Sequence, residues 1–213
     1  MSGTRASVLL GSLCLVGACG GSEPAAPADP DVLVVTIDTL RADKLGCYGY
    51  FRDTTPTLDS LAAESLVFER CLAPVSQTLP SHATLFTGLH PYEHGLLANL
   101  RENRAYVRAP GATSIAEVLA TEGYATAAFV AAEPVKRLGG LATGFEDWWE
   151  PDEKVVRANS VVPRAVAWLD EHARVGDRPF FLWVHLFDVH LPYAPPAAYA
   201  TRYGPEDASN SAQ

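Results

Sequence analysis

Short apolar runs alternate along the chain with longer segments in which apolar residues recur at helical spacing. The near-continuous β-branched and apolar run at 32–37 predicts a strand, and the runs at 125–131 and 180–184 predict two more. Residues 66–68 are expected to begin a further strand. A run as continuous as 32–37 is typical of a strand buried on both faces, which favours a parallel sheet covered by helices.

The segments between these strands carry helix signals. Pro56 opens a short helix, and Ser114 with Glu117 forms a capping box for another, which Gly123 closes. A third helix is expected over 160–172. Its buried face is predicted to consist of Val162, Val166 and Leu169. Strands separated by helices indicate an α/β fold with a mainly parallel sheet flanked by helices.

Polar residues follow the first and last strands, where ligands bind in parallel sheets. Asp38 and Thr39 come directly after the first strand, and their oxygen atoms suit a hard cation such as Ca²⁺ or Mg²⁺. Asp38 also fits a turn or a helix N-cap. His190 lies in a loop and is the candidate for a working imidazole, whereas His185 alternates with apolar residues and fits a packed core histidine.

Residues 78–88 place a hydroxyl residue, Thr78, just before a proline and a helix-forming run. A helix N-terminus offers unpaired N–H groups and a positive dipole end, so it favours an anion or a nucleophile that becomes negative. His82 follows four residues on and is expected on the same side of the helix. The alternative is that Thr78 only caps the helix.

The N-terminus predicts export. Residues 1–18 contain one positive charge and an apolar run of the length found in secretory signals. The small residues before Cys19 resemble a bacterial lipoprotein signal, in which that cysteine is lipidated. Residues 19–31 then form the lipidated cysteine and an Ala/Pro-rich tether, and the protein is expected at a membrane, facing the periplasm or the cell surface. An ordinary signal peptide with a chance cysteine is the alternative.

The composition of the chain limits the classes of partner that the protein is expected to bind. The formal net charge of −9 argues against nucleic acid, which requires a basic face. It is compatible with an anionic substrate, because a bound metal can supply local positive charge. Export permits a disulfide between Cys47 and Cys71, but two isolated cysteines favour free buried thiols.

Several segments, in the right order, resemble motifs of the sulfatase family of the alkaline-phosphatase-like superfamily. They are residues 37–43 with 45–49, 56–62, 78–88 with His90-Pro91, and 187–193. The resemblance covers most of residues 31–196. It implies a sulfatase-like α/β fold, in which residues 32–213 form the N-terminal part of the catalytic domain without its C-terminal half.

The resemblance also implies roles for individual positions. Asp38 matches the first aspartate of the family's divalent-metal site, and Thr39 stands where many members have a second one. Thr78 stands at the position of the cysteine or serine that sulfatases oxidise to formylglycine. His82 stands where an arginine usually supports that residue. His190 matches a histidine that contacts the sulfate or phosphate group of the substrate.

Thr78 changes the expected chemistry. Oxidation of a secondary alcohol gives a ketone, so no formylglycine is expected here. A threonine hydroxyl beside a cation can instead attack phosphorus. The resemblance therefore predicts a hydrolase or transferase of sulfate or phosphate esters, favouring phosphoesters. Its metal is expected to be Ca²⁺ or Mg²⁺, with Mn²⁺ and Zn²⁺ as alternatives.

The length of the chain supports a competing interpretation. Family members are usually about twice as long, and their further metal ligands lie in the part that this sequence lacks. A lone Asp38 with one hydroxyl is a poor site for a cation that takes six or more oxygen ligands. The alternative is a truncated, non-catalytic surface lipoprotein of the same fold.

Overall fold

The computed structural model describes residues 29–99, 105–175, 178–200 and 202. Its strands are β1 (Val32–Ile37), β2 (Ala125–Val130), β3 (Asp147–Trp149) and β4 (Phe180–Leu186). Its α-helices are α1 (Pro56–Ala63), α2 (Thr78–Thr87), α3 (Pro91–His94), α4 (Ile115–Thr121), α5 (Ala158–Val175) and α6 (Ala197–Ala200). Short 3₁₀ turns are η1 (Ala42–Lys44), η2 (Gly46–Tyr48), η3 (Glu133–Val135) and η4 (Arg137–Gly139). Among these helices, none is both long and apolar enough to cross a bilayer.

The four strands form one parallel sheet in the order β1-β4-β2-β3. β4 lies between β1 and β2, and its Trp183 pairs with Val34 on one side and with Ala128 on the other. Because all four strands run the same way, their carboxyl ends meet at one edge of the sheet. The predicted α/β fold with a parallel sheet is confirmed.

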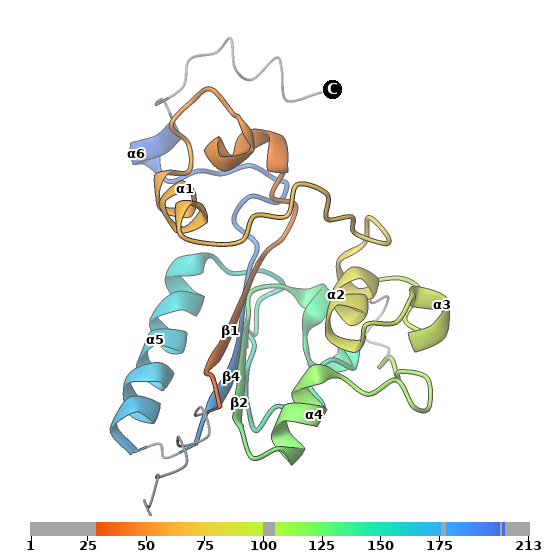
Figure 1. Ribbon diagram of the computed structural model, residues 1–213. Coiled ribbons are helices and arrows are strands. Elements are labelled where there is room, and N and C mark those ends of the chain that lie inside the picture. The colour runs from red at the N-terminus through yellow and green to blue at the C-terminus, as the bar shows by residue number, and fades with distance from the viewer. Residues whose placement is uncertain (1–28, 100–104, 176–177, 201, 203–213) are drawn as a thin grey trace, which may run out of the picture.

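Helices cover both faces of the sheet (Figure 1). α5 packs against β2 and β4 on one face, while α2, α3 and α4 lie on the opposite side. Each face has its own apolar core: Phe181 and Trp183 point into the core beneath α2, and Leu182 and Val184 into the core beneath α5. α1 and α6 lie beyond the carboxyl ends of the strands, at the top of Figure 1.

β1 is less buried than its sequence predicts. Val32 and Val34 pack against the core beneath α2, but Leu33 and Val35 on the other face are 52% and 51% exposed. The reason is topological, because β1 is an edge strand in the described part of the chain and α5 packs on its neighbours β4 and β2. An apolar run reveals that a strand forms, but not what covers it.

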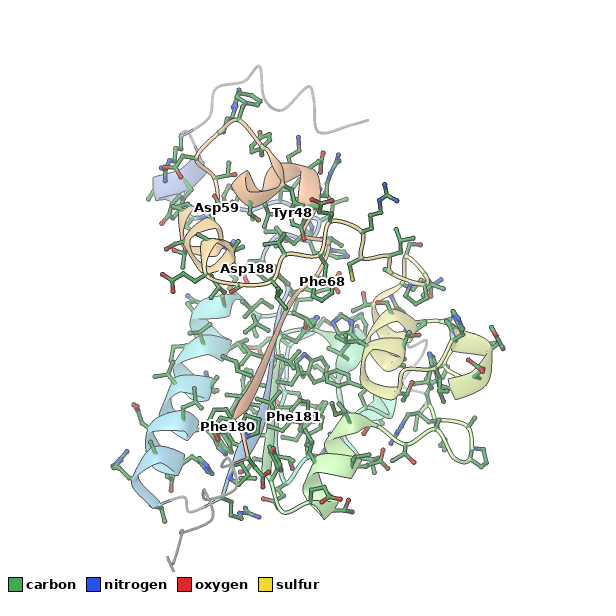
Figure 2. The ribbon with its side chains drawn as sticks, in the orientation of Figure 1. Tyr48, Asp59, Phe68, Phe180, Phe181 and Asp188 are labelled. Atoms are coloured by element: carbon green, nitrogen blue, oxygen red, sulfur yellow. The ribbon has the colours of Figure 1, made fainter. Side chains whose placement is uncertain are left out.

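The strand expected at 66–68 is wrong. In the structure these residues form an irregular segment between α1 and α2, and Leu66 and Phe68 are 90% and 70% exposed. Phe68 is tied to η2 because its carbonyl oxygen accepts the Tyr48 hydroxyl at 3.0 Å (Figure 2). The short strand β3 was not predicted, because three residues of charged and aromatic type give no alternation to detect.

The predicted helix at 160–172 is confirmed as part of the longer α5, and Leu169 packs against the core as predicted, but the other two predicted core positions are wrong. Val161 and Ala165 are buried, whereas Val162 and Val166 are 40% and 47% exposed. Both pairs have the same helical spacing, so periodicity alone could not choose between them. The helix also begins earlier than predicted, where the Asp188 carboxylate accepts the Ala158 N–H at 2.9 Å.

The predicted capping box of α4 is confirmed. The Ser114 hydroxyl accepts the Glu117 N–H at 3.3 Å, and the Glu117 carboxylate accepts the Ser114 N–H at 2.8 Å. The same carboxylate pairs with the largely buried Arg108 guanidinium at 2.5 Å. Burial acts to raise the pKa of Glu117, but the Ser114 N–H and Arg108 outweigh it and hold that pKa below its ordinary value.

Replacing the cap should weaken the fold measurably. We expect Ser114→Ala to lower the free energy of unfolding by about 1 kcal/mol, because it leaves helix N–H groups without their acceptor. Urea denaturation followed by circular dichroism measures this change. Ser60→Ala, at an exposed position inside α1, is the matched control and should stay within about 0.5 kcal/mol of the parent. Equal losses in the two variants would contradict the prediction.

Candidate active site

The carboxyl ends of β1 and β4 bring an aspartate and a histidine together. Asp38 follows β1 directly, and its N–H bonds to the carbonyl oxygen of Leu186 in β4 at 2.9 Å. His185 pairs in register with Thr36. Asp38 Oδ2 lies 3.7 Å from His185 Nε2, with side-chain exposures of 8% and 0%. Both atoms are buried without a hydrogen-bond partner.

The surroundings of His185 define its tautomer. Its Nδ1 accepts the backbone N–H of Ala131 at 3.4 Å, so this nitrogen carries no proton. In the neutral ring the proton is then on Nε2, the atom that faces Asp38. The sequence favoured a packed core histidine at this position; the ring is indeed buried, but it also borders the site.

Asp38 is held in its charged form. Burial acts to raise the pKa of its carboxyl group, but the side chains of His185 and Thr78 outweigh that effect and bring the pKa below its ordinary value. The side chains of His185 and Thr78 therefore stabilise the charged form of this largely buried carboxylate. Asp38 lies directly after the first strand, as predicted, and its side chain is largely buried among polar groups.

Thr78 is the first residue of α2 and lies beside Asp38. Gln77 occupies the N-cap position, so Thr78 is not the capping residue of this helix. Leu79 and Ala83 are fully buried and fix α2 against the sheet. Thr78 is 8% exposed, and its side chain is one of the neighbours that lower the pKa of Asp38. The structure thus places a hydroxyl and a carboxylate together at this helix end.

The helix end offers an anion fewer donors than the sequence suggested. The N–H of Leu79 is donated to Asn99 Oδ1 at 2.8 Å, and the N–H of Ser81 to the Gln77 carbonyl oxygen at 3.2 Å. Pro80 has no N–H. An anion at this position would therefore meet side-chain groups and the Thr78 N–H rather than a full set of free backbone donors.

His82 is hydrogen-bonded at both ring nitrogens. Nδ1 lies 2.8 Å from the Thr78 carbonyl oxygen, which can only accept, so Nδ1 carries the proton. Nε2 then accepts the Thr36 hydroxyl at 3.2 Å. The same hydroxyl accepts the Trp183 indole N–H at 3.0 Å. His82 is consequently a neutral ring of fixed tautomer, and both of its nitrogens serve contacts within the protein.

The environment also suppresses protonation of His82. Burial, together with the nearby His185 ring, lowers the pKa of His82 to about 4. The two imidazoles meet edge to face with ring centroids 5.1 Å apart. The site is therefore built around two buried histidines and one aspartate.

A cavity of about 540 Å³ opens beside this group. Asp38, Thr39, Cys71 and His82 are among the residues that line it. Thr39 has a backbone φ of +57°, in the left-handed region that a β-branched residue rarely adopts. Its hydroxyl donates to the Val189 carbonyl oxygen at 3.3 Å. Thr39 is thus a strained residue at the mouth of the site, where the local fold must hold it in place.

The described residues do not complete a metal site. They contain no group of three or more His, Cys, Asp or Glu side chains placed to hold a metal ion. Asp38 supplies one carboxylate, and Thr39 and Thr78 supply neutral hydroxyl groups. That set falls well short of the roughly six oxygen ligands of a hard cation.

His190 lies apart from the cavity that Asp38 lines. Its ring stacks on Phe187 at a centroid distance of 4.1 Å, and its Nδ1 lies 2.7 Å from the Leu191 carbonyl oxygen. It lines a separate cavity with Phe187 and Asp188. Figure 2 shows Asp188 beyond the carboxyl end of β4 and Phe180 at the other end of that strand.

Cys47 and Cys71 are free thiols, as expected, but they are not buried. Cys47 is half-buried and Cys71 is exposed, at the cavity beside Asp38. Cys19 lies outside the described residues. Sequence reasoning missed the contributions of Thr36 and Asn99, because neither residue stands in a recognisable motif and both act through contacts formed only on folding.

Comparison with known proteins identifies the family of the chain. A family model described as Sulfatase matches residues 30–212. Arylsulfatase A of Bos taurus is 41% identical over 103 residues, which cover 48% of this chain and 20% of the bovine protein. An N-acetylgalactosamine-6-O-sulfatase of Bacteroides thetaiotaomicron is 28% identical over 97 residues, or 46% of this chain and 19% of that protein. The matched stretch thus spans about a fifth of these relatives.

The fold is similar to that of solved structures at low sequence identity. The phosphonate monoester hydrolase of Agrobacterium radiobacter superposes with a TM-score of 0.64 at 20% identity, covering 84% of this chain and 45% of that one. A structure described as a 2-O GAG sulfatase superposes with a TM-score of 0.54 at 19% identity, covering 76% and 35%. These likenesses confirm the architecture.

The buried His82 should make stability depend on pH. Between pH 6.5 and about 4 the unfolded chain binds a proton that the folded protein excludes, so stability falls as the pH falls through this window. We expect the wild type to lose up to about 3 kcal/mol more than His82→Gln across this range. Urea titrations of both proteins at several pH values measure the difference. Parallel pH profiles would contradict the prediction.

Proposed function

The chain belongs to the sulfatase family, and from this premise we propose that it acts on sulfate or phosphate esters, with a preference for phosphoesters. The observation that supports this most directly is the position of Thr78 at the start of α2, where its side chain helps to lower the pKa of the Asp38 carboxyl group. A hydroxyl next to a largely buried carboxylate, at the positive end of a helix dipole, is arranged to attack an electrophile.

Thr78 is the proposed nucleophile. In the proposed reaction the Thr78 oxygen forms a bond to phosphorus, the ester P–O bond breaks, and the hydroxyl proton of Thr78 passes to the leaving alcohol. Water or an acceptor alcohol then attacks the phosphorus, the Thr78 O–P bond breaks, and the proton of the attacking group restores the Thr78 hydroxyl. Threonine cannot form the aldehyde that formylglycine requires, which is why the proposal favours direct attack on phosphorus over the hydrated-aldehyde route.

His82 and His190 have different roles in this proposal. Both ring nitrogens of His82 are engaged, and one of them binds the Thr78 carbonyl group, so His82 holds the nucleophile in position rather than binding substrate oxygens. The proposed contact to the anionic group is assigned to His190. His190 is half-buried in a loop after β4, a type of segment that often carries binding residues.

A divalent metal belongs to the proposal, since the sulfatase family typically uses one. Asp38 is the residue here that would bind it, and Ca²⁺ or Mg²⁺ best suits its carboxylate and the neighbouring hydroxyl groups. Mn²⁺ and Zn²⁺ are alternatives. The cation would supply positive charge next to the anionic ester.

A second function is favoured by the incomplete donor set. One carboxylate and two hydroxyl groups, without a further acidic or imidazole ligand among the described residues, suit a protein that binds an anionic ester without converting it. Binding of an anionic ester without its hydrolysis would favour this second function, that of a non-catalytic surface protein.

Removing the nucleophile should abolish turnover. We expect Thr78→Val, which keeps the shape of the side chain but lacks the hydroxyl, to reduce hydrolysis of nitrophenyl phosphate to background. Thr57→Val, at an exposed position in α1, should keep the parental rate. Assays with nitrophenyl phosphate, a phosphodiester and nitrophenyl sulfate, each with Ca²⁺, Mg²⁺, Mn²⁺, Zn²⁺ or EDTA, measure the rates. An unchanged rate in Thr78→Val would exclude Thr78 as the nucleophile.

We also propose that the protein is exported and anchored through lipid on Cys19. The signal-like residues 1–18 and the tether after them motivate this proposal. We expect Cys19→Ala, expressed in a bacterial host, to lose incorporation of labelled palmitate and to move from the detergent phase to the aqueous phase. Cys71→Ala is the matched control and should keep the label. Labelling of Cys19→Ala would show that the anchor lies elsewhere.

A further inference from the structure

Two buried polar atoms that face each other are left unexplained by the proposed chemistry. Asp38 Oδ2 and His185 Nε2 are 3.7 Å apart, and neither has a hydrogen-bond partner. A buried polar atom without a partner lowers the stability of the fold, and more so when the group is charged. Two such atoms side by side indicate either a shared ligand between them or a hydrogen bond that a small movement completes.

The contact of His185 Nδ1, the ring nitrogen that does not face Asp38, distinguishes these explanations. A histidine binds a metal through a nitrogen that carries no proton, while the other nitrogen donates its N–H. Here Nδ1 faces the Ala131 N–H, which is itself a donor, so Nδ1 must accept. The proton is therefore on Nε2, and that nitrogen cannot bind a cation without losing the Ala131 contact.

We propose that His185 is a positioning residue, which donates its Nε2–H to Asp38 Oδ2 and fixes the orientation of that carboxylate. A decrease of about 1 Å in the present separation gives an ordinary N–H···O hydrogen bond. Oδ2 is then occupied by His185, and Oδ1 is the oxygen left to face the Thr78 hydroxyl and the cavity. The catalytic consequence rests on the proposed function, whereas the pairing of the two side chains does not.

The rest of the site is consistent with this arrangement. His82, which meets His185 edge to face, has the opposite tautomer, with its proton on Nδ1. Phe187 and Trp183 pack around the His185 ring at centroid distances of 6.0 and 5.9 Å and keep water away from it. In such surroundings the Asp38 carboxylate is the acceptor that the His185 N–H can reach.

Nuclear magnetic resonance of ¹⁵N-histidine-labelled protein tests the proposal without any substrate. The correlation between ring protons and ring nitrogens distinguishes the two neutral tautomers. We expect His185 to show a protonated Nε2 and a bare Nδ1 in EDTA, and to keep that pattern after addition of Mg²⁺, Ca²⁺ or Zn²⁺. A protonated Nδ1, or loss of the Nε2 proton when a cation is added, would overturn the proposal in favour of a metal ligand.

The same spectrum contains its own controls. His82 should show the Nδ1–H pattern, and His94, whose Nδ1 accepts the Leu96 N–H at 3.1 Å, should show the Nε2–H pattern. His185→Gln assigns the signal of interest by its disappearance. If that variant does not fold, the corresponding Gln variants of the other histidines assign the His185 signal by elimination.

A second variant tests the pairing itself. Asp38→Leu removes the acceptor while keeping an apolar side chain of similar size. We expect the His185 Nε2–H resonance to move upfield and its exchange with water to accelerate, with the tautomer unchanged. An unaltered resonance would show that the two side chains do not interact. Because neither measurement uses turnover, a failure here is distinct from a failure of the Thr78 assay.

Discussion

The hydroxyl group of Thr36 joins the three elements that build the site. It sits near the end of β1, accepts the indole N–H of Trp183 from β4, and donates to Nε2 of His82 on α2. The other nitrogen of His82 then binds the Thr78 carbonyl group. A single half-buried hydroxyl thus connects the edge strand β1 and the strand β4 to the residue at the start of α2. The indole N–H can only donate and the carbonyl oxygen can only accept, so the direction of every bond between them is fixed.

This chain of bonds separates the roles of the two buried histidines. Nitrogen atoms that face a carbonyl oxygen must carry a proton, and those that face an N–H or a hydroxyl proton must not. His82 meets a carbonyl oxygen at Nδ1, whereas His185 meets a backbone N–H there, and their tautomers are therefore opposite. Two side chains of identical chemistry, about 5 Å apart, are thereby given different tasks by their backbone neighbours alone.

Much of this arrangement could be predicted from the sequence, because long apolar runs and strand ends are local signals. The strands at 32–37 and 180–184 and the positions of Asp38 and Thr78 follow from such signals. The pairing of Asp38 with His185 could not be predicted, since it depends on the register in which β1 lies beside β4. On the buried face of α5, Leu169 was predicted correctly, but Val162 and Val166 were chosen in place of Val161 and Ala165, because apolar residues occur on both candidate faces. The segment at 66–68 has strand composition but no partner strand in the described fold.

The position of Asp38 has a mechanical consequence. It is the first residue beyond β1, and within the described chain β1 is hydrogen-bonded along one side only, to β4. An edge strand has a row of unused peptide groups and can twist more freely than a strand held on both sides. The flexibility of β1 therefore determines how far the Asp38 carboxylate moves relative to the side chains of His185 and Thr78. A peptide segment that pairs with the outer side of β1 would tighten the site without touching it.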